Sequence, residues 1–109
     1  MKTAIIGCGF VADFYMSTIK HYSQLDLIKV YDKDKRRLKQ FSRFYKIRTA
    51  KTFDEILKDK NIELILNLTN PREHYKIIKK CLNQNKNVYT EKPLSMNYKE
   101  AKELFLLAK

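Results

Sequence analysis

The chain has 109 residues, 44% of them hydrophobic and 12% aromatic, and its 23 Lys and Arg against 12 Asp and Glu give a formal net charge of +11. This length allows one domain with a single core and excludes two ordinary domains, and the apolar content excludes a disordered chain. No apolar run approaches the ~18 residues that cross a bilayer, and the opening apolar stretch is too short for a secretory signal, so we expect an unprocessed cytoplasmic protein with no membrane partner.

Strands and helices are predicted to alternate along the first half of the chain. We expect a strand over Thr3–Ile6, a helix over Phe10–Lys20, a strand over Leu25–Tyr31, a helix from about Asp34 to Tyr45 and a short strand near Lys46–Arg48. Thr52 and Glu55 form a capping box, which predicts a brief helix that ends near Leu57 or Lys58.

The same alternation continues through the second half. We expect a strand over Ile62–Leu68, a helix after the N-cap Asn70, a strand over Asn87–Thr90 and a last helix from Asn97 to Ala108. The first of these strands is the most continuously apolar, which predicts a central position. The helix after Asn70 has Pro71 in its first turn and is expected to bury Ile77, Ile78, Cys81 and Leu82. Its end falls near Asn85, since asparagine tolerates the left-handed conformation.

The turn after the first strand has the spacing of a dinucleotide-binding fingerprint. Gly7 permits a tight turn, Gly9 lets a pyrophosphate approach the backbone, and Ala12 allows close packing of helix on strand. Asp32, at the end of the second strand, is placed to accept the ribose hydroxyls. The alternative is an ordinary strand-to-helix turn beside an unrelated surface aspartate.

This alternation predicts an α/β protein: a doubly wound (Rossmann) parallel sheet with strand order 3-2-1-4-5 and helices on both faces. A ligand crevice is expected between the carboxyl ends of the first and fourth strands. Three loops should therefore converge, namely Gly7–Val11, Leu68–His74 and Thr90–Pro93.

The predicted crevice favours a nicotinamide dinucleotide. The N–H groups of Phe10 and Val11 open a helix and can hold a diphosphate without a basic side chain. Asp32 would repel a 2′-phosphate, which favours NAD over NADP. Lys33, Arg36 and Arg37 weaken that preference, so NADP stays possible.

The other two loops carry polar side chains. Leu68, Thr69 and Asn70 would lie along the riboses, and His74 would sit one turn into the next helix, near the crevice. A lone histidine is more often a packing or capping residue, so that alternative stays open. Lys92, held by Glu91, is the predicted catalytic residue, because its ammonium could favour deprotonation of a substrate hydroxyl. The alternative is a solvated ion pair in a turn.

Cys8 and Cys81 have no spacing typical of a metal site or a disulfide scaffold, so we expect no metal and two small buried side chains. Cys8 lies in the glycine turn, where partial exposure is also possible. The predicted cofactor contacts are Gly7, Cys8, Gly9, Phe10, Val11, Asp32, Lys33, Arg37, Leu68, Thr69, Asn70, His74, Glu91 and Lys92.

The positive charge is concentrated after the second strand. Nine of the basic residues lie between Lys33 and Lys51, with Asp34 as the one acid among them. Such a stretch raises the question of nucleic acid, but the aromatic residues fall at core spacing and no nucleic-acid motif is present. We expect no nucleic-acid partner, and interpret the charge as a solvated face that steers an anionic ligand.

These motifs resemble the N-terminal domain of the glucose–fructose oxidoreductase, inositol dehydrogenase and MocA family. The matching residues, in order, are Gly7, Gly9, Ala12, Asp32, Asn70, Pro71, His74, Glu91, Lys92 and Pro93. The resemblance covers the whole chain and implies NAD(P)-dependent oxidation or reduction of a sugar, cyclitol or nucleotide sugar. It also implies that Lys92 touches both the nicotinamide ribose and the substrate.

One feature departs from the family pattern. Family members continue into a second α+β domain with the substrate-reading and proton-handling residues and often the oligomer interface, whereas this sequence stops at Lys109. We therefore expect residues 1–109 to be the dinucleotide-binding part of a longer, homo-oligomeric oxidoreductase, inactive alone. The alternative function is a non-catalytic dinucleotide sensor, and the sequence does not separate the two.

Overall fold

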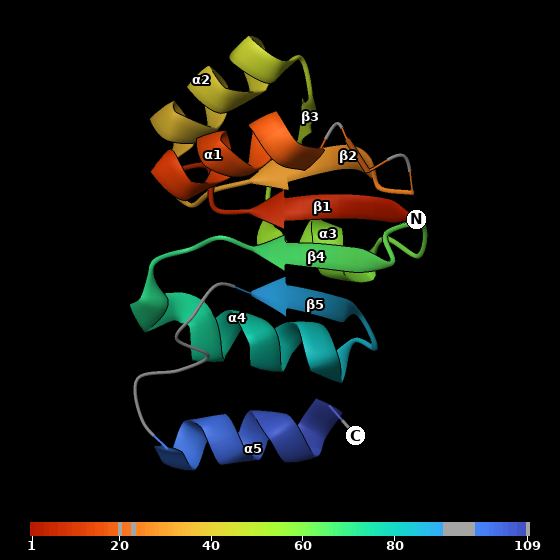
Figure 1. Ribbon diagram of the computed structural model, residues 1–109, viewed down its shortest axis with the longest axis vertical. Coiled ribbons are helices and arrows are strands. Elements are labelled where there is room, and N and C mark those ends of the chain that lie inside the picture. Colours follow the sequence, from red (N-terminus) through yellow and green to blue (C-terminus); the bar gives the residue numbers. More distant parts are fainter. Residues whose placement is uncertain (20, 23, 91–97, 109) are drawn as a thin grey trace.

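The computed structural model describes residues 1–19, 21–22, 24–90 and 98–108. Five parallel strands form one sheet in the order β3-β2-β1-β4-β5 (Figure 1). Their bounds are β1 Lys2–Ile6, β2 Asp26–Tyr31, β3 Arg48–Thr49, β4 Leu64–Asn67 and β5 Asn87–Thr90. The predicted α/β class and strand order are confirmed.

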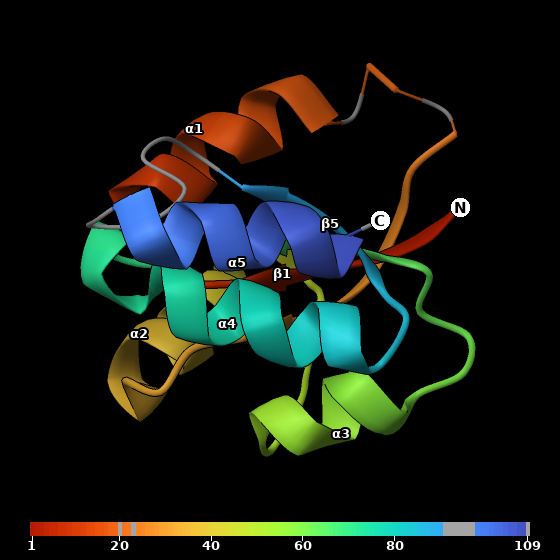
Figure 2. The ribbon, with the colours of Figure 1, turned by 90° about the horizontal axis from the view of Figure 1, so that it is seen from below.

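The described helices cover both faces of this sheet. They are α1 Phe10–Ile19, α2 Lys35–Tyr45, α3 Phe53–Lys58, α4 Pro71–Asn83 and α5 Tyr98–Ala108. Figure 2 shows α1 and α3 on opposite sides of the sheet, and Figure 1 shows α5 beside α4, beyond the edge strand β5. None of the described helices is long and apolar enough to span a membrane.

Two apolar layers follow from the side-chain alternation of β1. Ile5 faces a layer that includes Ala12 of α1 and Phe41 of α2. Ala4 and Ile6 face the other layer, with residues of α3 and α4. Because β1 is buried on both faces, it occupies the middle of the sheet. The prediction that the fourth strand is central is therefore only partly right: β4 is an interior strand, between β1 and β5.

The helix ends were largely predictable from local capping chemistry. Asp34, Thr52 and Asn70 each accept a backbone N–H of the helix that follows, and Asn85 adopts a positive φ of 59°. The strand predicted near Lys46–Arg48 begins later than expected. Lys46 ends α2 in the left-handed conformation with φ 56°, and the pairing with β2 starts only at Arg48.

The buried side of α4 is narrower than predicted. Of the residues expected on the inner side of α4, Ile78 and Cys81 are buried, whereas Ile77 and Leu82 are only partly so. The predicted cap Asn97 of the last helix lies outside the described residues.

Candidate functional site

The turn after β1 needs glycine at its first position. Gly7 has φ 99°, and its N–H donates to the carbonyl oxygen of Tyr31 at 2.8 Å. A Cβ on Gly7 would lie 2.7 Å from the carbonyl carbon and oxygen of Leu68. This residue therefore fixes how closely the turn approaches both β2 and the end of β4.

Gly9 differs from Gly7 because its open side faces the crevice. A Cβ there would meet the guanidinium of Arg37, with Nη1 at 3.4 Å. Directly after it, α1 starts at Phe10, whose side chain is 87% exposed. The first-turn N–H groups of a helix have no intrahelical acceptor, so this surface can hold an anion.

The carboxylate of Asp32 ties the turn to the end of β2. Asp32 is buried; Oδ2 accepts the backbone N–H of Cys8 and Oδ1 that of Asp34, both at 2.8 Å. Nη1 of Arg37 lies 3.9 Å from Oδ2. These contacts orient the carboxylate, which keeps further acceptor capacity for ligand hydroxyls. The tie from Cys8 to Asp32 joins residues 24 positions apart, and no sequence pattern predicts it.

Cys8 contributes this backbone N–H rather than its thiol. The side chain is 3% exposed and packs in the layer that contains Ala12. Burial, followed by the charge of Asp32, raises the pKa of the Cys8 thiol to about 12. Burial likewise raises the pKa of Cys81 to about 12. Both residues have small buried side chains with unreactive thiols. This confirms the expectation of two buried cysteines, and not the alternative of a partly exposed Cys8.

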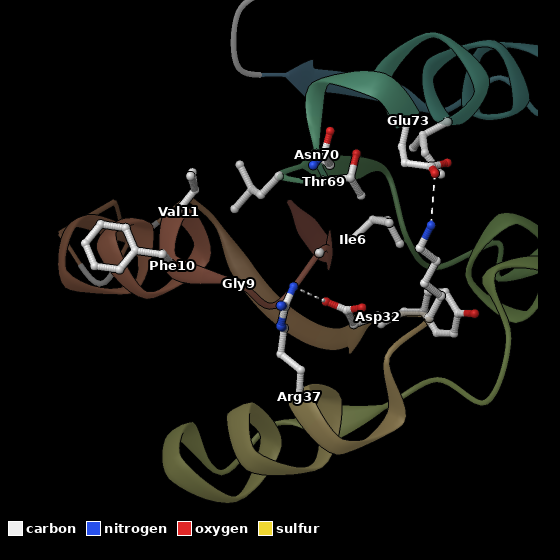
Figure 3. A pocket seen from close by; sticks show the side chains of 14 residues that line it. Ile6, Gly9, Phe10, Val11, Asp32, Arg37, Thr69, Asn70 and Glu73 are labelled. Carbon is white, nitrogen blue, oxygen red and sulfur yellow. Dashed lines mark hydrogen bonds and ion pairs between the residues drawn. The ribbon is translucent and has the colours of Figure 1, made fainter.

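A cavity of about 290 Å³ opens between the start of α1, the end of β2 and the loop that joins β4 to α4 (Figure 3). Hereafter "the pocket" means this cavity. Its predicted lining residues are Gly7, Gly9, Phe10, Val11, Asp32, Lys33, Arg37, Leu68, Thr69 and Asn70. Sequence reasoning missed the other four, which are Ile6, Tyr31, Glu73 and Ile77. The first and second of the three converging loops therefore meet, as the topology predicts.

Glu73 and Lys33 meet across this pocket. Their Oε1 and Nζ atoms are 2.9 Å apart, and Figure 3 shows Glu73 at the end opposite Phe10 and Val11. The hydrogen bond from Lys33 lowers the pKa of Glu73 below its ordinary value. Because 40 positions separate the two residues, their pairing has no signal in the sequence.

The β4–α4 loop is held by a buried amide that the sequence analysis missed. Asn67 is 0% exposed, and its Oδ1 accepts the hydroxyl of Thr69 at 2.6 Å. Among the described residues, its Nδ2 has no hydrogen-bond partner. The one available signal was a polar residue inside the apolar run of β4. This amide fixes Thr69 at the pocket wall.

His74 does not face the pocket as expected. Its ring is 1% exposed, and Nε2 lies 2.9 Å from the carbonyl oxygen of Thr69. The first turn of α4 carries this ring inward, beneath the loop, because α4 packs on the sheet through His74, Ile78 and Cys81. The alternative considered above, a packing residue, describes His74 better than a cofactor contact does.

The structure describes only the first residue, Thr90, of the third predicted loop. The hydroxyl of Thr90 donates to the carbonyl oxygen of Asn67 at 3.4 Å, which places the end of β5 beside the end of β4. Glu91, Lys92 and Pro93 lie outside the described residues. Among the residues that the structure does describe, no cluster of His, Cys, Asp and Glu could hold a metal ion.

The sheet order, the glycine turn and the pocket at the carboxyl ends of β1 and β4 define a protein of the Rossmann class. A family model described as "Oxidoreductase family, NAD-binding Rossmann fold" matches residues 1–109. The chain belongs to this family, that of glucose–fructose oxidoreductase, inositol dehydrogenase and MocA, which confirms the resemblance stated from the motifs.

Individual relatives agree with this assignment. An uncharacterised oxidoreductase of Schizosaccharomyces pombe is 36% identical over 118 residues, covering 100% of this chain and 31% of the relative. Myo-inositol 2-dehydrogenase of Thermotoga maritima is 26% identical over 98 residues, covering 89% of this chain and 29% of the enzyme. The crystal structure of GenD2 from gentamicin A biosynthesis, in complex with NAD, matches with a TM-score of 0.92 at 26% identity, covering 99% of this chain and 31% of that one. The chain thus spans about a third of the length of these relatives.

Proposed function

We propose that the chain binds a nicotinamide dinucleotide in the pocket and forms the cofactor half of an oxidoreductase. The observation that carries this proposal is the juxtaposition of the open side of Gly9 and the oriented carboxylate of Asp32 on one cavity. A diphosphate fits against the N–H groups of Phe10 and Val11, and a ribose fits against Asp32. The complex of GenD2 with NAD is consistent with this proposal.

The residues of the chain hold and orient the cofactor. Backbone N–H groups of α1 replace the water around the diphosphate, and Asp32 accepts the hydroxyls of the adenosine ribose. Leu68, Thr69 and Asn70 wall the pocket along the riboses, with Thr69 held by Asn67 and His74. When bound, the cofactor supplies a nicotinamide ring that accepts or donates a hydride. Lys92 stays the proposed catalytic residue and Glu91 its partner.

The proposed reaction is oxidation of a hydroxyl, or reduction of a keto group, of a sugar, cyclitol or nucleotide sugar. Support comes from relatives named as myo-inositol 2-dehydrogenase and trans-1,2-dihydrobenzene-1,2-diol dehydrogenase. These enzymes are about three times longer than the matched region. We therefore infer that turnover needs a further substrate-binding part, which would also form the interface of a homo-oligomer. We propose that the enzyme acts in the cytoplasm and has no nucleic-acid partner.

Titration of the purified chain with NADH, followed by nicotinamide fluorescence, tests the binding proposal. We expect saturable binding that survives moderate salt, because the diphosphate contacts are backbone N–H groups rather than surface cations. A parallel titration with an oligonucleotide should show weak affinity that collapses with salt. If neither NADH nor NADPH binds under any condition, the proposed function is wrong.

A further inference from the structure

The described side chains of the pocket carry balanced charge although the chain is strongly basic. Among the residues that the structure describes, two acids and two bases line the pocket, namely Asp32, Glu73, Lys33 and Arg37, whereas the chain as a whole carries +11. Each lysine or arginine of this set lies beside a carboxylate of the same set. An additional phosphate that enters here meets cations that are already paired.

The two pairs differ in geometry. Arg37 lies across Gly9, with Nη1 3.9 Å from Oδ2 of Asp32, on the side of the pocket that belongs to α1. Lys33 instead reaches across the pocket to α4, where Nζ is 2.9 Å from Oε1 of Glu73. The side chain of Lys33 is 75% exposed and that of Glu73 is 32% exposed. Among the residues that the structure describes, the ion pair with Glu73 is the contact that holds Lys33 against this wall. An exposed lysine otherwise samples many rotamers.

Lys33 follows Asp32 directly in the chain, so it is the cation closest in sequence to the proposed ribose site. A 2′-phosphate on that ribose would carry negative charge beside the Asp32 carboxylate. A free ammonium at Lys33 could pair with this phosphate and offset the repulsion from Asp32. The ion pair with Glu73 competes for the same ammonium.

We propose that Glu73 is a specificity-determining residue that disfavours NADP relative to NAD by holding Lys33 across the pocket. The inference rests on the proposed function. Glu73 acts here through Lys33, and it does so from α4, on the wall opposite Asp32, which follows β2. Asp32 is expected to favour NAD over NADP by itself. Glu73 adds a second contribution to this preference, and that contribution depends on a contact between distant segments.

The test compares the affinities of the purified chain for NADPH and NADH, followed by nicotinamide fluorescence. In Glu73→Gln the helix keeps a good N3 residue while the ion pair is lost. We expect the ratio of NADPH to NADH affinity to rise about fivefold, the upper range for an exposed ion pair. In Lys33→Met/Glu73→Gln, compared with Lys33→Met alone, this gain should disappear.

Glu103→Gln is the matched control, because it removes a carboxylate from another exposed pair, Lys79–Glu103 at 2.8 Å, that does not line the pocket. An unchanged ratio in Glu73→Gln, or a gain that persists without Lys33, would overturn the inference. A gain of the same size in Glu103→Gln would also overturn it, since net charge alone would then explain the shift. A wild-type chain that binds neither dinucleotide would instead refute the proposed function.

Discussion

The two walls of the pocket are built by different means. On the β1–α1–β2 wall, the positions are set by backbone contacts: Gly7 donates to Tyr31 and Cys8 donates to the carboxylate of Asp32. On the β4–α4 wall, they are set by buried side chains, since Asn67 and His74 both hold Thr69. The first wall therefore depends on backbone N–H donors in the glycine turn, and the second on the polar atoms of buried side chains.

Gly7→Ala should have the largest effect on stability. Its φ of 99° strains any L side chain, and the new Cβ would sit 2.7 Å from the backbone of Leu68. We expect a loss of about 3 kcal/mol in the free energy of unfolding, measured by urea denaturation. Gly9→Ala is the matched control: among the described residues its Cβ meets the Arg37 guanidinium, with Nη1 at 3.4 Å, and no backbone atom, so stability should change by less than about 0.5 kcal/mol. Similar losses for the two variants would contradict a wall fixed at Gly7.

Gly9→Ala should nevertheless weaken NADH binding, since its added methyl group occupies the open side of the turn. The two glycine variants thus separate folding from binding on the same wall.

His74→Ala probes the second wall and should cost about 2 kcal/mol, because it removes a buried ring and the contact with the Thr69 carbonyl. Urea denaturation measures the loss, and His21→Ala, at an exposed position, is the control. We also expect weaker NADH binding, since Thr69 loses its support at the pocket wall. Full stability in His74→Ala would mean that the contact between His74 and Thr69 does not hold this loop.

Asp32→Ala tests how much the β1–α1–β2 wall contributes to dinucleotide binding. Loss of the carboxylate removes the proposed ribose acceptor and also frees the N–H of Cys8. We expect NADH affinity to fall about tenfold, equivalent to about 1.4 kcal/mol, and NADPH affinity to fall less, because the repulsion of a 2′-phosphate is lost as well. Fluorescence titration with both nucleotides measures this difference. Equal losses would reject the ribose role and leave Asp32 as a purely structural tie.

The difference between the walls also explains what the sequence could predict. The strand order and Gly7, Gly9 and Asp32 were readable, because periodicity and glycine spacing are local signals. The Lys33–Glu73 pair joins segments 40 positions apart, which a local pattern does not contain. Asn67 and His74 contact Thr69 nearby in the chain, but their burial follows from the way β4 and α4 pack in the sheet. Lys46 was missed for a local reason: a lysine at positive φ gives no signal of the kind that glycine or asparagine gives.

The two cysteines allow the stability of the two walls to be compared as a function of pH. Cys8 belongs to the first wall, and Cys81 packs behind the second. Each folded thiol has a pKa raised from 9.0 to about 12. Raised values mean that the full stability is present below pH 9, and that it declines above it as the unfolded thiol ionises first. Between pH 7 and pH 10, each cysteine should therefore contribute a loss of about 1 kcal/mol in the free energy of unfolding. Urea denaturation of Cys8→Ala and Cys81→Ala at both pH values measures the two contributions. A clearly smaller contribution from Cys8 would show that the glycine turn admits water more readily than the core behind α4, and would contradict a first wall fixed by its backbone.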